Sequence, residues 1–121
     1  LLERADPKTN RVVEVNVIDF KTEHLNDDDY DPRYRDSMFQ VRLYALATQS
    51  QLPVTTRAGY IHYLSEGVRR EVVVNDIVLH QIREDVKSKV RKIMSRNFTP
   101  VCNPVICNKC DRRNLCRHSA A

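Results

Sequence analysis

The strongest constraint on the fold is a repeated change in the period of the apolar residues. Residues 11–20 are rich in valine and isoleucine, which is typical of a strand, whereas the apolar residues of 76–96 recur every three or four positions, which is typical of a helix. The pattern predicts the order β-β-α-β-β-α, an α/β or α+β layout without internal repeats. The expected elements are a hairpin over 1–20 with its turn at 6–10, a helix over 33–49, strands over 56–64 and 69–75 with a turn at 65–67, and a helix over 76–96.

Local signals mark the ends of both helices. Asp31 followed by Pro32 is typical of a helix N-cap and first turn, and Pro53 ends that segment. Asn75 or Asp76 is expected to cap the second helix.

Composition sets broad limits. The chain has 121 residues, of which 41% are hydrophobic and 30% are charged, which suits one soluble globular domain or part of one. No run approaches the ~18 apolar residues of a membrane span, and no signal peptide is visible. The chain opens on Leu-Leu-Glu without Met, as a piece of a longer protein would. The formal net charge is +4, with acidic residues gathered at 26–31 and basic residues in the last third, so a polyanionic partner is compatible.

Two pairs of polar residues stand out against the apolar pattern. Asp19 and Lys21 share one strand face because side chains alternate along a strand. Gln40 and Tyr44 lie one turn apart on one helix face. Each pair has a plain alternative: a salt bridge at a strand end, and a core tyrosine beside a solvated glutamine.

All four cysteines fall within fifteen residues, at Cys102, Cys107, Cys110 and Cys116. The spacing C-x4-C-x2-C-x5-C, in a chain without an export signal, indicates a metal site in a reducing compartment rather than disulfides. Four thiolates suit tetrahedral zinc or an iron–sulfur cluster. His118 is an alternative zinc ligand, although a solvated role fits it better.

These motifs, in this order, resemble the C-terminal part of a RecB-like nuclease of the PD-(D/E)XK superfamily, in the iron–sulfur branch that includes AddB-type and CRISPR adaptation nucleases. "VIDFKT", "QVRLYA" and the C-terminal cysteines carry the resemblance. It implies an α/β, restriction-endonuclease-like core, a mixed central sheet flanked by helices, over 1–99. It also implies a cysteine-rich metal-binding tail over 100–121, packed on the same domain.

The resemblance assigns a role to each motif. Asp19 matches the metal-binding acid, for Mg²⁺ or Mn²⁺, and Lys21 matches the lysine that orients the attacking water and the phosphate. Gln40 and Tyr44 match the Q-x-x-x-Y helix motif, which contacts DNA. The cluster ligands, for a 4Fe-4S cluster or alternatively Zn²⁺, are matched by Cys107, Cys110 and Cys116, with Cys102 as a fourth ligand or a spare thiol.

One part of the family pattern is incomplete. The family has an earlier acid on the preceding strand, which this alignment puts just before Leu1. Inside the chain the fallback metal ligands are Glu3, which is better placed on a strand, and Asp6.

The resemblance implies a metal-dependent DNA nuclease domain, part of a cytoplasmic repair or recombination helicase–nuclease. The implied partners are single-stranded DNA or duplex ends and a helicase domain or subunit, with no membrane. One alternative is a catalytically inactive DNA-binding module of the same fold, stapled by an iron–sulfur or zinc site. Another is a zinc-ribbon interaction domain, which leaves the Asp19–Lys21 and Gln40–Tyr44 pairs unexplained.

Overall fold

The computed structural model describes residues 2–24, 32–100 and 102–120. The expected acidic loop at 26–31, with the expected N-cap Asp31, lies outside these residues. The chain forms two compact units, Leu1–Lys87 and Ser88–Ala121. The division expected from the resemblance, 1–99 and 100–121, is a different one and stays a prediction. No helix among the described residues has the length and apolar character needed to cross a membrane.

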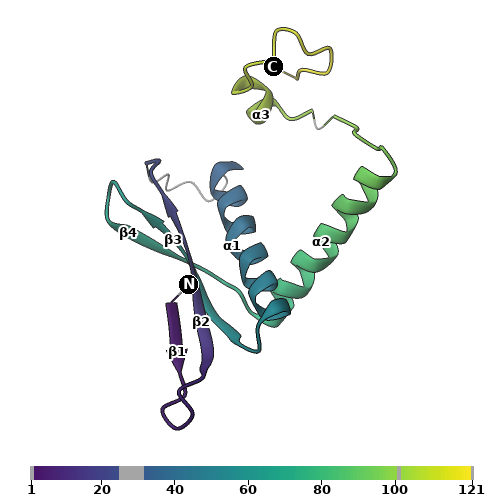
Figure 1. Ribbon diagram of the computed structural model, residues 1–121. Helices are drawn as coiled ribbons and strands as arrows, with labels where there is room; N and C mark the ends of the chain where they lie inside the picture. Colours follow the sequence, from purple (N-terminus) through teal and green to yellow (C-terminus); the bar gives the residue numbers. More distant parts are fainter. Residues whose placement is uncertain (1, 25–31, 101, 121) are drawn as a thin grey trace. The chain divides into compact units, whose positions relative to one another are not determined.

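The first unit is built on a four-stranded mixed sheet (Figure 1). Its strands are β1 (Leu2–Ala5), β2 (Val12–Lys21), β3 (Thr55–Tyr63) and β4 (Val68–Val72), in that spatial order. The pairs β1–β2 and β3–β4 are antiparallel hairpins, as the sequence predicts, and β2–β3 is parallel. The parallel pair is joined through a helix, so the α/β prediction is confirmed.

The β1–β2 hairpin is short and closed by Asp6. Asp6 Oδ1 accepts the Lys8 N–H at 2.9 Å, and its Oδ2 accepts the Thr9 hydroxyl at 3.0 Å. The backbone hydrogen bond from Lys8 is the largest cause of the lowered pKa of Asp6. Both carboxylate oxygens of Asp6 therefore serve the turn, and the structure gives this fallback ligand no place at a metal site.

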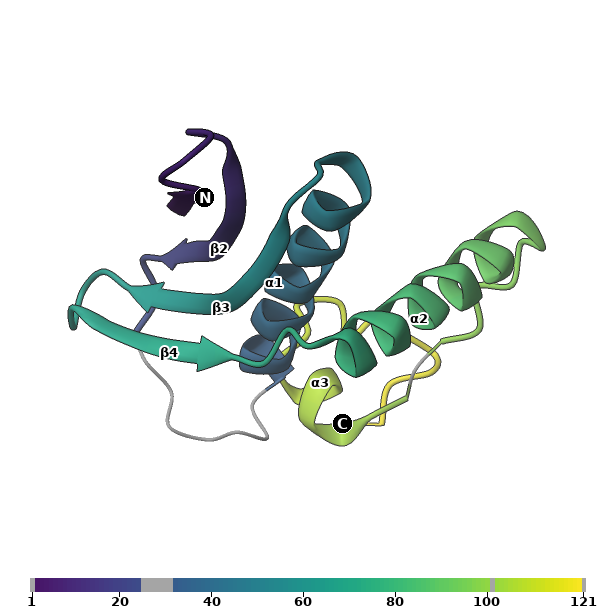
Figure 2. The same cartoon turned by 90° about the horizontal axis from the view of Figure 1, so that it is seen from below.

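Helix α1 (Pro32–Gln51) lies along one face of the sheet (Figures 1 and 2). The core between them is apolar and largely aliphatic: Val17, Tyr34, Val41, Ala45, Ile61, Tyr63, Val72, Val74 and Leu79. The approach is close at Gly59, where an added Cβ would lie 2.6 Å from Val41 Cγ1 and 2.9 Å from Val74 Cγ1. A glycine at this strand position thus sets how near α1 comes to β3.

Helix α2 (Asp76–Met94) begins where expected, because Asn75 Oδ1 accepts the Val78 N–H at 2.9 Å as an N-cap. Its apolar stripe is buried only at Leu79 and Ile82, and Ile93 is 60% exposed. The period of three or four therefore predicted the helix correctly, but only its first half lies in the core.

The second unit contains the last residues of α2 and the cysteine tail. The tail forms a short helix, α3 (Pro104–Asn108), that the sequence did not predict. Asn103 caps it by accepting the Val105 N–H at 2.9 Å, and Pro104 occupies the first turn.

Candidate active site

The end of β2 and the middle of α1 are linked by a continuous chain of polar side chains. Lys21 Nζ lies 3.0 Å from Asp19 Oδ2 and donates a hydrogen bond to Gln40 Oε1, also at 3.0 Å. Gln40 Nε2 in turn donates to the Tyr44 hydroxyl at 2.8 Å. The structure therefore brings together the four residues that the sequence singled out, two from a strand and two from a helix.

The backbone geometry accounts for this arrangement. Asp19 and Lys21 project from the same face of β2 as the buried Val17, and this is the face that α1 covers. Gln40 and Tyr44 stand one turn apart on α1, so Gln40 meets Lys21 while Tyr44 extends the chain to a more open position, where it is 46% exposed.

Asp19 keeps one carboxylate oxygen without a hydrogen bond. The side chain of Asp19 is 14% exposed and that of Lys21 is 22% exposed, so both charges are largely withdrawn from water. Asp19 Oδ2 is buried and has no hydrogen-bond partner among the described residues, so its contact with Lys21 is an ion pair without hydrogen-bond geometry. A buried carboxylate oxygen in this state suits a hard cation.

Three further residues pack near the lysine. Tyr63 stands opposite Lys21 in the β2–β3 register and is 3% exposed. Burial raises the pKa of Tyr63, so its hydroxyl stays protonated. The Arg70 guanidinium lies over the Tyr34 ring at 4.3 Å from the ring centroid. The sequence analysis missed these residues, although equal spacing along two parallel strands could have paired Tyr63 with Lys21.

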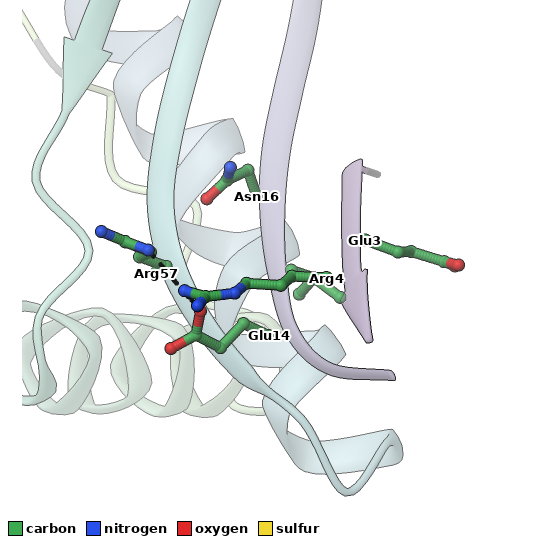
Figure 3. Close-up of a pocket in the computed structure, with 6 residues that line it drawn as sticks. Glu3, Arg4, Glu14, Asn16 and Arg57 are labelled. Carbon is green, nitrogen blue, oxygen red and sulfur yellow. Dashed lines mark hydrogen bonds and ion pairs between the residues drawn. The ribbon is translucent and has the colours of Figure 1, made fainter. Parts of the chain in front are cut away.

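Glu3 is not brought to Asp19. In the β1–β2 register Glu3 faces Val15, four residues before Asp19, which corresponds to about 13 Å along the strand. Figure 3 shows its side chain pointing away from the neighbouring polar residues. Those neighbours pair among themselves, because Arg4 and Arg57 lie 3.1 Å and 3.7 Å from Glu14 Oε2.

The four cysteines lie on a chain of tight turns with free thiols. Cys110 N–H donates to the Cys107 carbonyl at 3.1 Å, and Cys116 N–H donates to that of Arg113 at 3.4 Å. Their number and spacing fit a soft metal or cluster. In the part of the chain that the structure describes, however, no three His, Cys, Asp or Glu side chains are gathered as a metal site. The cysteine cluster therefore stays a prediction from the donor set.

A comparison with protein families decides the lineage. The model of the PD-(D/E)XK nuclease superfamily matches residues 3–117 of the 121. The chain belongs to the PD-(D/E)XK nuclease superfamily. The match spans the whole Asp19–Tyr44 chain and all four cysteines, and it agrees with the mixed sheet and its helix. Among curated proteins, none matches this sequence.

Membership of the PD-(D/E)XK superfamily accounts for two charged groups at the end of a buried strand. Most members are nucleases, and nucleases of this superfamily generally use a divalent cation such as Mg²⁺. The superfamily match does not distinguish the iron–sulfur branch from other branches.

Proposed function

We propose that this PD-(D/E)XK chain is a metal-dependent deoxyribonuclease domain that hydrolyses phosphodiester bonds. The observation that carries the proposal is the buried Asp19–Lys21 pair, held at the end of β2 by Gln40 of α1. A carboxylate and an ammonium at this separation match the two groups that phosphodiester hydrolysis requires, a ligand for a hard cation and a cation for the phosphate.

Each residue of the polar chain has a role in this proposal. Asp19 would hold Mg²⁺ or Mn²⁺, which when bound lowers the pKa of water and offsets charge on the phosphate. Lys21 orients the attacking water and stabilises the negative charge that develops on the phosphate oxygens. Gln40 fixes the ammonium through its side-chain oxygen. Tyr44 accepts from Gln40, so its own O–H is available to donate to DNA.

The basic surface of α2 and the tail supports DNA as the substrate. The exposed basic residues there are Arg83, Lys87, Lys89, Arg91, Lys92, Arg96, Lys109, Arg112, Arg113 and Arg117. Contacts from such residues go mainly to phosphates, so binding should weaken as salt rises.

The finer assignments rest on the resemblance. We propose that Cys102, Cys107, Cys110 and Cys116 hold a 4Fe-4S cluster, with Zn²⁺ as the alternative, and that this site stabilises the tail rather than taking part in cleavage. We also propose a cytoplasmic helicase–nuclease as the parent protein, since the order of motifs matches that branch of the superfamily.

The test of the proposed function is cleavage of end-labelled single-stranded and duplex DNA in Mg²⁺ or Mn²⁺. We expect Asp19→Asn to lower cleavage at least about 100-fold, because it removes the carboxylate charge that binds the cation. Glu71→Gln, a change at an exposed acid on β4, is the matched control. Circular dichroism and thermal melting of both variants report whether the fold is kept. Unchanged cleavage by folded Asp19→Asn would remove Asp19 from the site.

Glu3 is tested in the same assay. The register keeps Glu3 away from Asp19, so we expect Glu3→Gln to lower cleavage much less than Asp19→Asn does. An equal loss would make Glu3 the second metal-binding carboxylate, as the sequence analysis expected.

A second function is favoured by one observation. Asp19 is the one carboxylate that the described residues bring to Lys21 by a printed contact, and a single carboxylate holds Mg²⁺ weakly. The second candidate is therefore an inactive DNA-binding module of the same fold. Salt-sensitive DNA binding by the folded, metal-supplied chain without any cleavage would favour it.

A further inference from the structure

A hollow of about 300 Å³ lies directly beside the polar chain. Val17, Ile18, Tyr44, Ala47 and Thr48 line it, so it is formed by β2 and α1 alone. Its volume is at the lower end of the ~300–1,000 Å³ range of small-molecule pockets.

The lining is apolar and carries no charged side chain. The Thr48 hydroxyl is already used, because it donates to the Tyr44 carbonyl at 2.8 Å. The Tyr44 side chain is 46% exposed, so its ring offers an accessible aromatic surface. A flat, largely apolar group that stacks on an aromatic ring is the ligand that this lining suits.

The hollow also has polar groups at one border. β1 pairs with β2 only up to Asn16, so in the described chain the β2 edge from Val17 to Lys21 has no strand beside it on that side. A strand edge presents unpaired N–H and C=O groups. An occupant with hydrogen-bonding groups at its rim could use them.

The position of the hollow ties it to the reaction. It shares Tyr44 with the polar chain, and Val17 and Ile18 directly precede Asp19. We propose that the hollow binds the base of an unpaired nucleotide next to the phosphate that is cleaved. This inference rests on the proposed nuclease function and narrows its substrate to single-stranded or frayed DNA.

The preference for unpaired DNA follows from the cost of exposing a base. In a duplex both faces of a base are stacked, and turning it out costs a few kcal/mol, whereas a single strand exposes its bases at little cost. Stacking on an aromatic side chain then contributes binding that does not depend strongly on base identity. The hollow is therefore a site that selects strand form rather than sequence.

The test moves one abasic nucleotide along a single-stranded oligonucleotide and measures cleavage bond by bond with the full chain in Mn²⁺. We expect wild-type cleavage to fall about tenfold or more at the bond whose neighbouring base is missing, and at no distant bond. Ala47→Leu fills the hollow from an exposed helix position, so this variant should cleave base-bearing and abasic sites at similar, low rates. Ser50→Leu, an equally exposed change on α1 outside the lining, should keep the wild-type pattern.

The outcomes separate this inference from the proposed function. Equal wild-type cleavage at all abasic positions, or an abasic effect that survives in Ala47→Leu, overturns the nucleobase site and leaves the nuclease. Hydrolysis of methyl p-nitrophenyl phosphate, a diester without a base, by the wild type tests the metal site alone. A wild type that cleaves neither this diester nor DNA overturns both.

Discussion

Gln40 is the residue that joins the two halves of the site. Its amide accepts from Lys21 and donates to Tyr44, so it fixes the positions of both partners. We expect Gln40→Leu to lower kcat about tenfold or more, because a hydrogen bond to a charged group contributes ~1.5–3 kcal/mol. DNA affinity should change little.

The control for Gln40 is Gln49→Leu, the same change on the same helix outside the polar chain. Cleavage kinetics of both variants, with DNA binding measured by fluorescence anisotropy, make the comparison. A loss of affinity with normal kcat in Gln40→Leu would show that Gln40 binds DNA rather than positioning Lys21.

Tyr63 predicts how stability depends on pH. Burial raises its pKa above the ordinary value of 10.0, so the folded state holds the phenol proton more tightly than the unfolded state does. Its contribution to stability is complete below pH 10 and is lost as the pH rises through the folded-state pKa. Urea unfolding from pH 8 to 11 should show wild-type stability falling more steeply than that of Tyr63→Phe. Parallel curves would contradict this assignment.

Individual residues could be predicted where local geometry decides them. Strand alternation paired Asp19 with Lys21, and the helical period paired Gln40 with Tyr44. The bond between Lys21 and Gln40 depends on how α1 crosses the sheet, which no local pattern specifies. The position of Glu3 depends on the register of a four-residue strand with an irregularity at Arg4 and Ala5, and so short a strand specifies its register weakly.

At the scale of elements, the contact between α1 and β3 controls the site. Gly59 leaves no room for a Cβ against Val41 and Val74. We expect Gly59→Ala to cost about 1–3 kcal/mol of stability through overpacking, and to lower cleavage as well, because a displaced α1 carries Gln40 away from Lys21.

Gly67→Ala is the control for that prediction. Gly67 has φ +66° and open space around it, so alanine there costs about 1 kcal/mol of backbone strain without moving α1. Denaturant unfolding and cleavage measured on both variants should show a loss of activity only in Gly59→Ala. Full activity in a destabilised Gly59→Ala would separate helix packing from the site.

The longer elements were predictable and the tail was not. Valine-rich alternation and the apolar period of the helices gave correct strands and helices near their observed bounds. The α2 stripe continues to Ile93 in sequence, but the sheet and α1 offer core contacts only as far as Ile82. A sequence period shows that a helix has an apolar face without showing what covers it. The five residues of α3 are too few to produce a period at all.

At the scale of the whole molecule, the cysteines predict that stability depends on metal. If they hold a cluster or zinc, the binding free energy contributes to folding. Purified wild type should then contain iron and absorb visible light, or contain zinc. Cys110→Ser should lose the metal and lower the melting temperature, whereas Asn108→Ser, between two of the cysteines, should lose neither. Metal-free wild type with an unchanged melting temperature would contradict both forms of the site.

The link between Lys21 and Gln40 also bears on the life of the chain before it is folded. The strand carries the charges, and the helix that steadies them is made later and must dock across the sheet before the two meet. A nascent, misfolded or clipped chain would thus contain every reactive group and still be harmless to the genome of the cell that makes it. Cutting would begin only when the last check on assembly has been passed.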